Sequence, residues 1–215
     1  MKIKTNGFAS VKIAFKKVTI VTDPTCTKEI AGAFSKVQAD VVLYTHKDLI
    51  GKEGVLEEAE LINKVEVSEG RKLVEIVNPG EYEVGEVFIR RAINQNVYVL
   101  DEDDIRVVYL SEGSKDMSLD VFKNMGDVDV LIVPGGGGER YMGFDKLEKV
   151  IKAVDPTVLI PTCFAEDGIK IEGLKTSEDF IKHFGYTNVT EEKTFKITKG
   201  KDADNKIMQV VLLKA

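Results

Sequence analysis

Short segments with almost no polar residues recur along this sequence, and they limit the folds that the chain is able to adopt. Three of them have the length of a β-strand: Asp40–Thr45, Val128–Val133 and Val158–Ile160. An apolar run of this length, without alternating polar positions, is typical of a strand that is buried on both faces. Each of these strands therefore needs another layer of structure on either side of its sheet.

The remaining periodicity predicts further strands and a few helices. Turn residues at Pro79-Gly80 and Asp101–Asp104 separate four strand-like segments, and this spacing indicates an antiparallel meander. The sequence has no repeat and no Pro- or Ser-rich linker, so we expect one domain over residues 1–215. Helices towards both ends of a β-rich middle predict an α+β fold in which helices sandwich two sheets. The other expected strands are Val11–Phe15, Val18–Val21, Lys72–Val77, Tyr82–Arg90, Val97–Leu100, Ile105–Leu110, Phe195–Thr198 and Ile207–Leu213, and the expected helices are Lys28–Val37, Ser118–Met125, Tyr141–Val154 and Thr176–Phe184.

Composition and charge exclude several classes of protein. The chain has 30 Lys and Arg residues against 36 Asp and Glu residues, a formal charge of −6, and we expect no nucleic-acid partner. No apolar run approaches the roughly 20 residues needed to span a membrane, and the N-terminal segment lacks the continuous apolar core of an export signal. Two cysteines are too few for a disulfide framework. We therefore expect a cytoplasmic protein, with no membrane partner and with reduced thiols.

Polar residues follow directly after four of the expected strands. Ligand-binding and catalytic groups of α/β proteins gather where strands end. We therefore expect one cleft at this edge of the sheets, suited to a small molecule and carrying Asp23, His46, Glu112 and Cys163. The four segments are Asp23-Pro24, Thr45–Asp48, Ser111–Gly113 and Thr162-Cys163.

Six short motifs follow one another in a characteristic order. They are Gly7-Phe8-Ala9-Ser10, Asp23-Pro24, Thr45-His46, Pro79–Val84, Asp127–Gly138 and Asp155–Pro161. This order resembles that of the metallo-β-lactamase superfamily, in particular its lactonase-like branch of small, single-domain, metal-dependent hydrolases. The resemblance covers the chain from about Gly7 to the C-terminus. It implies a four-layer αββα sandwich, which agrees with the α+β pattern described above.

The resemblance also implies a two-metal site, in which the metal ions generate a hydroxide that attacks the substrate. The family carries several of the metal ligands on a Thr-His-x-His-x-Asp-His loop. His46 matches the first histidine of that loop, whereas Asp48 stands at the position of the second. Ile50 and Gly51 stand at the next two ligand positions and have no side chain that binds a metal.

The remaining ligand positions depart from the family pattern in the same way. Tyr109 stands where a further histidine is expected, and Glu112 stands where the bridging aspartate is expected. Cys163 takes the place of the last histidine, and Phe8 that of a histidine after Gly7. A dinuclear site needs about five or six imidazole or carboxylate ligands. The sequence has 2 histidines, and His183 belongs to the expected C-terminal helix.

This ligand count favours a diverged member that has lost the dinuclear centre and acts as a pseudo-hydrolase or binding scaffold without a cofactor. One alternative is a mononuclear hydrolase of an ester, lactone or phosphodiester. It would hold one Zn, Mn or Fe on His46, Asp48, Glu112 and Cys163, a mixture of ligand types that suits zinc. The sequence is compatible with a homo-oligomer, and a second chain that completes the site would overturn this ligand count.

A second alternative is a metal-free enzyme in which Cys163 is the nucleophile. The candidates for a catalytic role are thus Cys163 and His46. Both residues also have a purely structural interpretation, with His46 as a partly buried residue at a strand end and Cys163 as an inert, buried thiol.

Two other segments have simple interpretations. Gly135–Gly138, together with Arg140, is either an anion cradle built from backbone N–H groups or a flexible connection. Asp101–Asp104 offers oxygen ligands for Ca²⁺ but lacks EF-hand spacing, so we expect a solvated hairpin turn.

Overall fold

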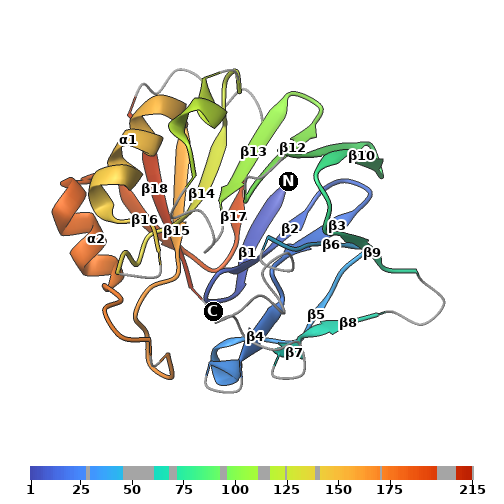
Figure 1. Ribbon diagram of the computed structural model, residues 1–215, viewed down its shortest axis with the longest axis horizontal. Coiled ribbons are helices and arrows are strands. Elements are labelled where there is room, and N and C mark those ends of the chain that lie inside the picture. The colour runs from blue at the N-terminus through green and yellow to red at the C-terminus, as the bar shows by residue number, and fades with distance from the viewer. Residues whose placement is uncertain are drawn as a thin grey trace.

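We analysed a computed structural model of the chain, which describes residues 1–27, 30–45, 61–67, 72–92, 96–110, 117–123, 125–138, 141–169, 171–197 and 207–214. Two large sheets dominate it (Figure 1). The first has six strands, in the order β17-β1-β2-β3-β6-β9. Their bounds are β17 (Phe195–Lys196), β1 (Lys2–Gly7), β2 (Ser10–Ala14), β3 (Thr19–Thr22), β6 (Val41–Leu43) and β9 (Val74–Ile76).

The second sheet has eight strands, in the order β10-β11-β12-β13-β14-β15-β18-β16. The first four strands form an antiparallel meander. From β13 onwards each strand is parallel to the next one in this order. The carboxyl ends of the parallel strands therefore meet at one edge of the sheet. The bounds are β10 (Gly80–Val84), β11 (Val87–Arg91), β12 (Val97–Glu102), β13 (Ile105–Leu110), β14 (Val130–Pro134), β15 (Val158–Thr162), β18 (Gln209–Leu213) and β16 (Val189–Glu192).

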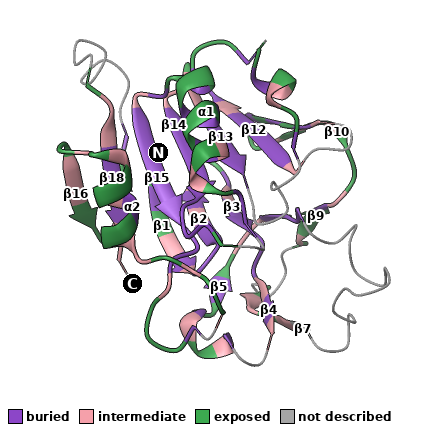
Figure 2. Ribbon diagram, turned by 60° about the vertical axis from the view of Figure 1, so that its left-hand side comes forward, coloured by how far each residue is buried: buried purple, intermediate pink, exposed green. Residues whose placement is uncertain are grey.

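The two sheets pack face to face around a shared apolar core. In β11 the residues alternate between buried and exposed, so one face of the strand points into this core. In β14 and β15 every residue is buried, as the continuous apolar runs predict, because a second layer covers their other face (Figure 2). The core contains residues from both sheets, including Ile13, Ile20, Leu43, Leu100, Tyr109, Ile132 and Ile160.

That second layer consists of helices α1 (Phe144–Val154) and α2 (Ser177–Phe184), which cover the outer face of the eight-stranded sheet (Figure 1). The apolar stripe of α1 is buried at Leu147, Val150, Ile151 and Val154. Helix α2 begins with a capping box between Thr176 and Asp179 and ends at Gly185 in the left-handed conformation. The α+β sandwich predicted from the sequence is thereby confirmed.

The remaining described elements are short. They are two 3-10 turns and two small strand pairs, β4 with β7 and β5 with β8. None of the helices in the described part of the chain has both the length and the apolar character that crossing a bilayer requires. The bounds are η1 (Ala31–Ala33), η5 (Leu119–Phe122), β4 (Thr25–Thr27), β7 (Leu61–Asn63), β5 (Val37–Gln38) and β8 (Val65–Glu66).

Two of the expected helices are wrong where the structure describes them. Within Lys28–Val37 the backbone makes only the 3-10 turn η1, and Val37 already belongs to strand β5. Ile30 and Phe34 are nevertheless buried, so their spacing reflects burial and not a helical period. Ser118–Met125 likewise contains only the 3-10 turn η5, which the Ser118 hydroxyl caps.

One segment that was expected to form a single strand forms two strands. Tyr82–Arg90 folds as the hairpin β10–β11, because Gly85 and Glu86 both adopt positive φ, of 58° and 67°. Two consecutive left-handed residues are what a tight hairpin turn requires. The expected meander also begins one strand later than the sequence indicates, since β9 pairs with β6 in the six-stranded sheet.

Candidate functional site

Two of the strand ends selected from the sequence meet in space, and a tyrosine from a third strand joins them. Asp23 follows β3, Thr45 follows β6, and Tyr109 lies near the end of β13 in the opposite sheet. Their side chains are joined by hydrogen bonds, and we call these three residues the Asp23 network. The network thus links the ends of both sheets at the edge where a site was expected.

The carboxylate of Asp23 is the acceptor at the centre of this network. Its Oδ1 accepts the backbone N–H of Thr45 at 2.8 Å, and its Oδ2 accepts the Thr45 hydroxyl at 2.6 Å. Oδ2 also accepts the Tyr109 hydroxyl, at 2.9 Å. Asp23 is 3% exposed and Thr45 is fully buried, so these bonds replace the water that a carboxylate would otherwise bind.

Tyr109 supplies its hydrogen bond from a completely buried position. Burial, and then the negative charge of Asp23, raise the pKa of the Tyr109 phenol well above its ordinary value. The phenol therefore stays neutral and keeps its proton at physiological pH. Its oxygen also lies 3.1 Å from the carbonyl oxygen of Ala9, on the β1–β2 hairpin, so this hairpin is part of the same edge.

Cys163 lies at the same edge, directly after β15. Its backbone is left-handed, with φ of 61°, and its N–H donates to the Phe8 carbonyl at 3.3 Å. The side chain is 2% exposed and packs in an apolar cluster with Phe8 and Tyr141, and Sγ lies 3.5 Å from the Thr162 hydroxyl. Cys163 is therefore close to the Asp23 network, but its thiol is shielded from solvent.

The other predicted metal ligands, His46, Asp48 and Glu112, lie outside the described residues, as do Ile50 and Gly51. Their ligation of a metal stays a prediction. His183 is placed, as expected, on α2, where its ring lies 4.7 Å from that of Phe144.

The described residues do not by themselves fit a two-metal site. Both oxygens of Asp23 already accept protein hydrogen bonds, and Phe8 has no donor atom to offer a metal. Within the described ranges, no three His, Cys, Asp or Glu side chains are grouped so as to hold a metal ion. The described polar groups of this edge are joined to one another by hydrogen bonds.

The first two glycines of the Gly135–Gly138 segment serve close backbone packing. The N–H of Gly135 donates to the Thr162 carbonyl at 2.7 Å. A Cβ on Gly136 would lie 1.9 Å from the carbonyl oxygen of Cys163. The glycines thus let two chain segments touch beside Cys163, whereas Arg140 lies outside the described residues.

Arg91 also lies at this edge, although no sequence motif indicates it. Arg91 is 3% exposed; its Nη2 lies 3.5 Å from the Thr45 carbonyl oxygen, and its guanidinium carbon lies 5.6 Å from the centre of the Tyr98 ring. The alternation within β11 would have indicated that Arg91 points inward with Val87 and Ile89.

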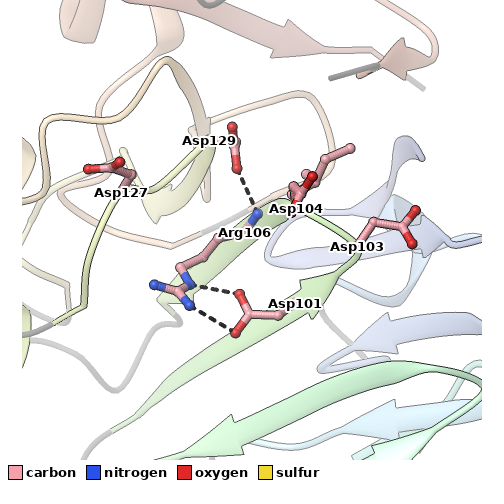
Figure 3. A pocket seen from close by; sticks show the side chains of 7 residues that line it. Asp101, Asp103, Asp104, Arg106, Asp127 and Asp129 are labelled. Carbon is pink, nitrogen blue, oxygen red and sulfur yellow. Dashed lines mark hydrogen bonds and ion pairs between the residues drawn. The ribbon is translucent and has the colours of Figure 1, made fainter. Parts of the chain in front are cut away.

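The Asp101–Asp104 segment forms the expected hairpin turn, between β12 and β13. Asp103 is left-handed, and the Arg106 guanidinium binds Asp101 through Nε and Nη2, at 2.7 and 3.2 Å. The Arg106 backbone N–H also donates to Asp129, at 2.7 Å (Figure 3). These residues line a hollow of about 530 Å³ in which Arg106 organises the nearest carboxylates, so the hollow gives no support for a Ca²⁺ site.

Comparison with known proteins agrees with this architecture. The sequence profile of the beta-lactamase superfamily domain matches residues 2–163. No curated protein matches the chain in sequence.

Several solved structures share the fold. A protein from Thermotoga maritima, assigned as a Zn-dependent hydrolase of the metallo-β-lactamase superfamily, is 24% identical and superposes with a TM-score of 0.74, over 100% of both chains. Igni18, a metallo hydrolase from Ignicoccus hospitalis, is 14% identical with a TM-score of 0.58, over 92% of this chain and 99% of its own. An isothiocyanate hydrolase from Delia radicum gut bacteria is 10% identical with a TM-score of 0.62, over the same fractions. At these identities the likeness concerns the fold alone.

Proposed function

The chain belongs to the beta-lactamase superfamily domain family, with the fold of the metallo-β-lactamase hydrolases, and from this premise we propose that it is a diverged member without a dinuclear metal centre. Its strand-end site serves as a binding scaffold for a small molecule. The two cysteines are free and buried, which suits the reducing cytoplasm that we propose as its location.

One observation carries this proposal: the Tyr109 hydroxyl donates a hydrogen bond to the Asp23 carboxylate. A carboxylate buried at the edge of a metal site is ordinarily stabilised by the positive charge beside it. Here three neutral donors from Thr45 and Tyr109 fill that role, and Tyr109 stands where the family resemblance expects a histidine. These hydrogen bonds support a network in which protein donors stabilise the buried Asp23 carboxylate.

Metal removal tests the proposal. A metal bound to the native state stabilises the fold by mass action, so removing it lowers the melting temperature. We expect the melting temperature of the native chain to change by less than about 1 °C in excess EDTA and in excess Zn²⁺. The check is differential scanning calorimetry of the native chain and of His46→Ala.

A fall of several degrees in EDTA, which is absent in His46→Ala, would overturn the proposal. It would instead support the mononuclear hydrolase with His46, Asp48, Glu112 and Cys163 as ligands. The structural neighbours from Thermotoga maritima and Ignicoccus hospitalis are described as a Zn-dependent hydrolase and a metallo hydrolase, which makes a metal-dependent hydrolase the alternative if the proposal fails.

Thiol labelling distinguishes the third candidate, a Cys163-dependent enzyme. Burial raises the pKa of the Cys26 thiol, and Cys163 is as deeply buried as Cys26. Because only an accessible thiolate reacts, we expect iodoacetamide at neutral pH to label both thiols at least about tenfold more slowly in the folded chain than in urea. Mass spectrometry of the labelled peptides is the measurement, and rapid labelling of Cys163 beside a slow Cys26 would favour the Cys163-dependent enzyme.

A further inference from the structure

The outer face of the six-stranded sheet carries a group of lysines on the neighbouring strands β17, β1 and β2 (Figure 1). In β1, Ile3 points into the core, so Lys2 and Lys4 lie on the opposite, outer face. Strand pairing places Lys196 of β17 directly opposite Lys2. It likewise places Lys12 of β2 directly opposite Lys4. We call these four lysines the lysine face.

The ammonium groups of the lysine face have no carboxylate partner among the described residues. Lys2, Lys4 and Lys196 are exposed, and Lys12 is half-buried. None of the four forms an ion pair or a side-chain hydrogen bond within the ranges that the structure describes. Helices α1 and α2 pack on the eight-stranded sheet, so neither of them covers this face.

Composition does not explain this isolation. Acidic residues outnumber basic ones, 36 to 30, so carboxylates are available over most of the surface. Lysines elsewhere do pair with them, as Lys36 does with Glu66 at 2.8 Å and Lys152 with Glu148 at 2.7 Å. The lysine face is therefore a local positive patch on a chain of net negative charge.

The arrangement of these lysines also opposes the stability of the sheet. Like charges directly opposite each other on neighbouring strands repel, because their Cβ atoms lie only about 4.5 to 5.5 Å apart. A lysine on an edge strand protects a sheet from aggregation, which accounts for Lys196 on β17. Lys4 and Lys12, however, lie on β1 and β2, which have a neighbouring strand on both sides. An anionic partner placed between these two lysines removes their repulsion.

The spacing of the lysine face matches an extended peptide that has an acidic residue at every second position. Lys2 and Lys4 are two residues apart on one strand, which corresponds to about 6.6 to 6.8 Å. Alternate side chains of an extended peptide repeat at the same distance and point to one side. Lys196 and Lys12 lie on the two flanking strands, so carboxylates placed along β1 have ammonium groups on either side.

Other large anions match this face less closely. The described outer residues of β17, β1 and β2 include no aromatic side chain, on which a nucleic-acid base would stack, and no arginine. They also include no large apolar side chain that would enter a bilayer. The net charge of −6 further opposes the approach of a long polyanion or an anionic membrane.

We propose that the lysine face binds an acidic segment of a partner protein, which lies extended along β1 with its carboxylates at alternate positions. The carboxylates face the ammonium groups of Lys2 and Lys4 on β1 and those of Lys196 and Lys12 on the flanking strands. This surface is separate from the strand-end site, so the inference holds whether or not the proposed function does.

Three fluorescein-labelled peptides of eight residues test the proposal by fluorescence anisotropy. The first alternates Glu with Thr, the second alternates Gln with Thr, and the third has four Glu followed by four Thr. The alternating acidic peptide is expected to bind about tenfold more tightly than the neutral one. It is expected to bind about threefold more tightly than the third peptide, half of whose carboxylates point away from the sheet.

Substitution of the central lysine pair locates the binding surface. The double variant Lys4→Gln/Lys12→Gln is expected to weaken binding of the alternating acidic peptide about tenfold, as is an increase from about 20 to about 300 mM salt. Lys182→Gln, which removes an exposed lysine on α2, is the matched control and leaves the affinity unchanged. Circular dichroism establishes that each variant folds.

An affinity that the double variant does not change would overturn the proposal, as would equal binding of the acidic and neutral peptides. Tighter binding of a single-stranded oligonucleotide of eight nucleotides would overturn it in favour of a nucleic acid. Tighter binding of phosphatidylcholine vesicles that contain phosphatidylserine would overturn it in favour of a membrane surface. Charge reversal in Lys4→Glu/Lys12→Glu is expected to transfer binding to a peptide that alternates Lys with Thr, and failure of this transfer would also contradict the proposal.

Discussion

Replacing Asp23 with Asn is expected to lower the free energy of unfolding by about 3 kcal/mol. The carboxylate accepts three hydrogen bonds from buried donors of Thr45 and Tyr109. An amide offers one oxygen and points an NH₂ group at donors, so at least one buried hydrogen bond is lost. Asn tolerates the left-handed backbone that Asp23 adopts, with φ of 37°, so the loss reports on the side chain. Urea unfolding followed by circular dichroism measures it.

Asp103→Asn is the matched control for this experiment. Asp103 is also left-handed, with φ of 52°, but its side chain is 60% exposed and pairs with Lys16 in solvent. An exposed pair of this kind contributes less than about 1 kcal/mol, so the control should unfold nearly as the native chain does. If Asp23→Asn does not fold, Tyr109→Phe removes one donor only and is expected to cost about 1 to 2 kcal/mol. Loss of less than about 0.5 kcal/mol in both Asp23→Asn and Tyr109→Phe would show that the network does not stabilise the fold.

Gly136→Ala should be at least as damaging, with a loss of about 3 kcal/mol. The added Cβ would lie 1.9 Å from the carbonyl oxygen of Cys163 and 2.9 Å from a methyl carbon of Leu174. Because the first of these atoms belongs to the backbone, the end of β15 must move to make room. Urea unfolding gives the energy, and faster iodoacetamide labelling of Cys163 reports the displacement.

Gly32→Ala makes the same substitution where nothing lies within 4 Å of the new Cβ. We expect a change within about 0.5 kcal/mol for this variant. If Gly136→Ala and Gly32→Ala have equal stability, the close packing beside Cys163 is not as we describe it.

The buried strands were predictable from the sequence because burial on both faces requires a continuous run of apolar residues. β14 is a wholly apolar run, and β15 is apolar up to its last residue, Thr162. Helix α2 carries both its N-cap at Thr176 and its glycine at Gly185. The pairing of the strands into two sheets had no such signature in the sequence. Nothing local distinguishes β9, which joins the six-stranded sheet, from β10, which opens the other sheet. Ile30 and Phe34 have the spacing of one helical face, but they are buried by residues that are distant in the sequence and not because they form a helix.

The candidate site was predictable only in part. The positions of Asp23, Thr45 and Cys163 after strands placed them at one edge, since parallel strands align their ends. The bond between Tyr109 and Asp23 joins residues 86 positions apart, and only the packing of the two sheets brings them together. A tyrosine inside an apolar strand does indicate that its hydroxyl needs a partner, but not which one.

The most direct test of the metal-free site is elemental analysis of the native chain, purified without added metal or chelator, beside His46→Ala. Our account predicts far less than one zinc, manganese or iron ion per chain in both proteins. One or two metal ions per native chain, lost in His46→Ala, would contradict it.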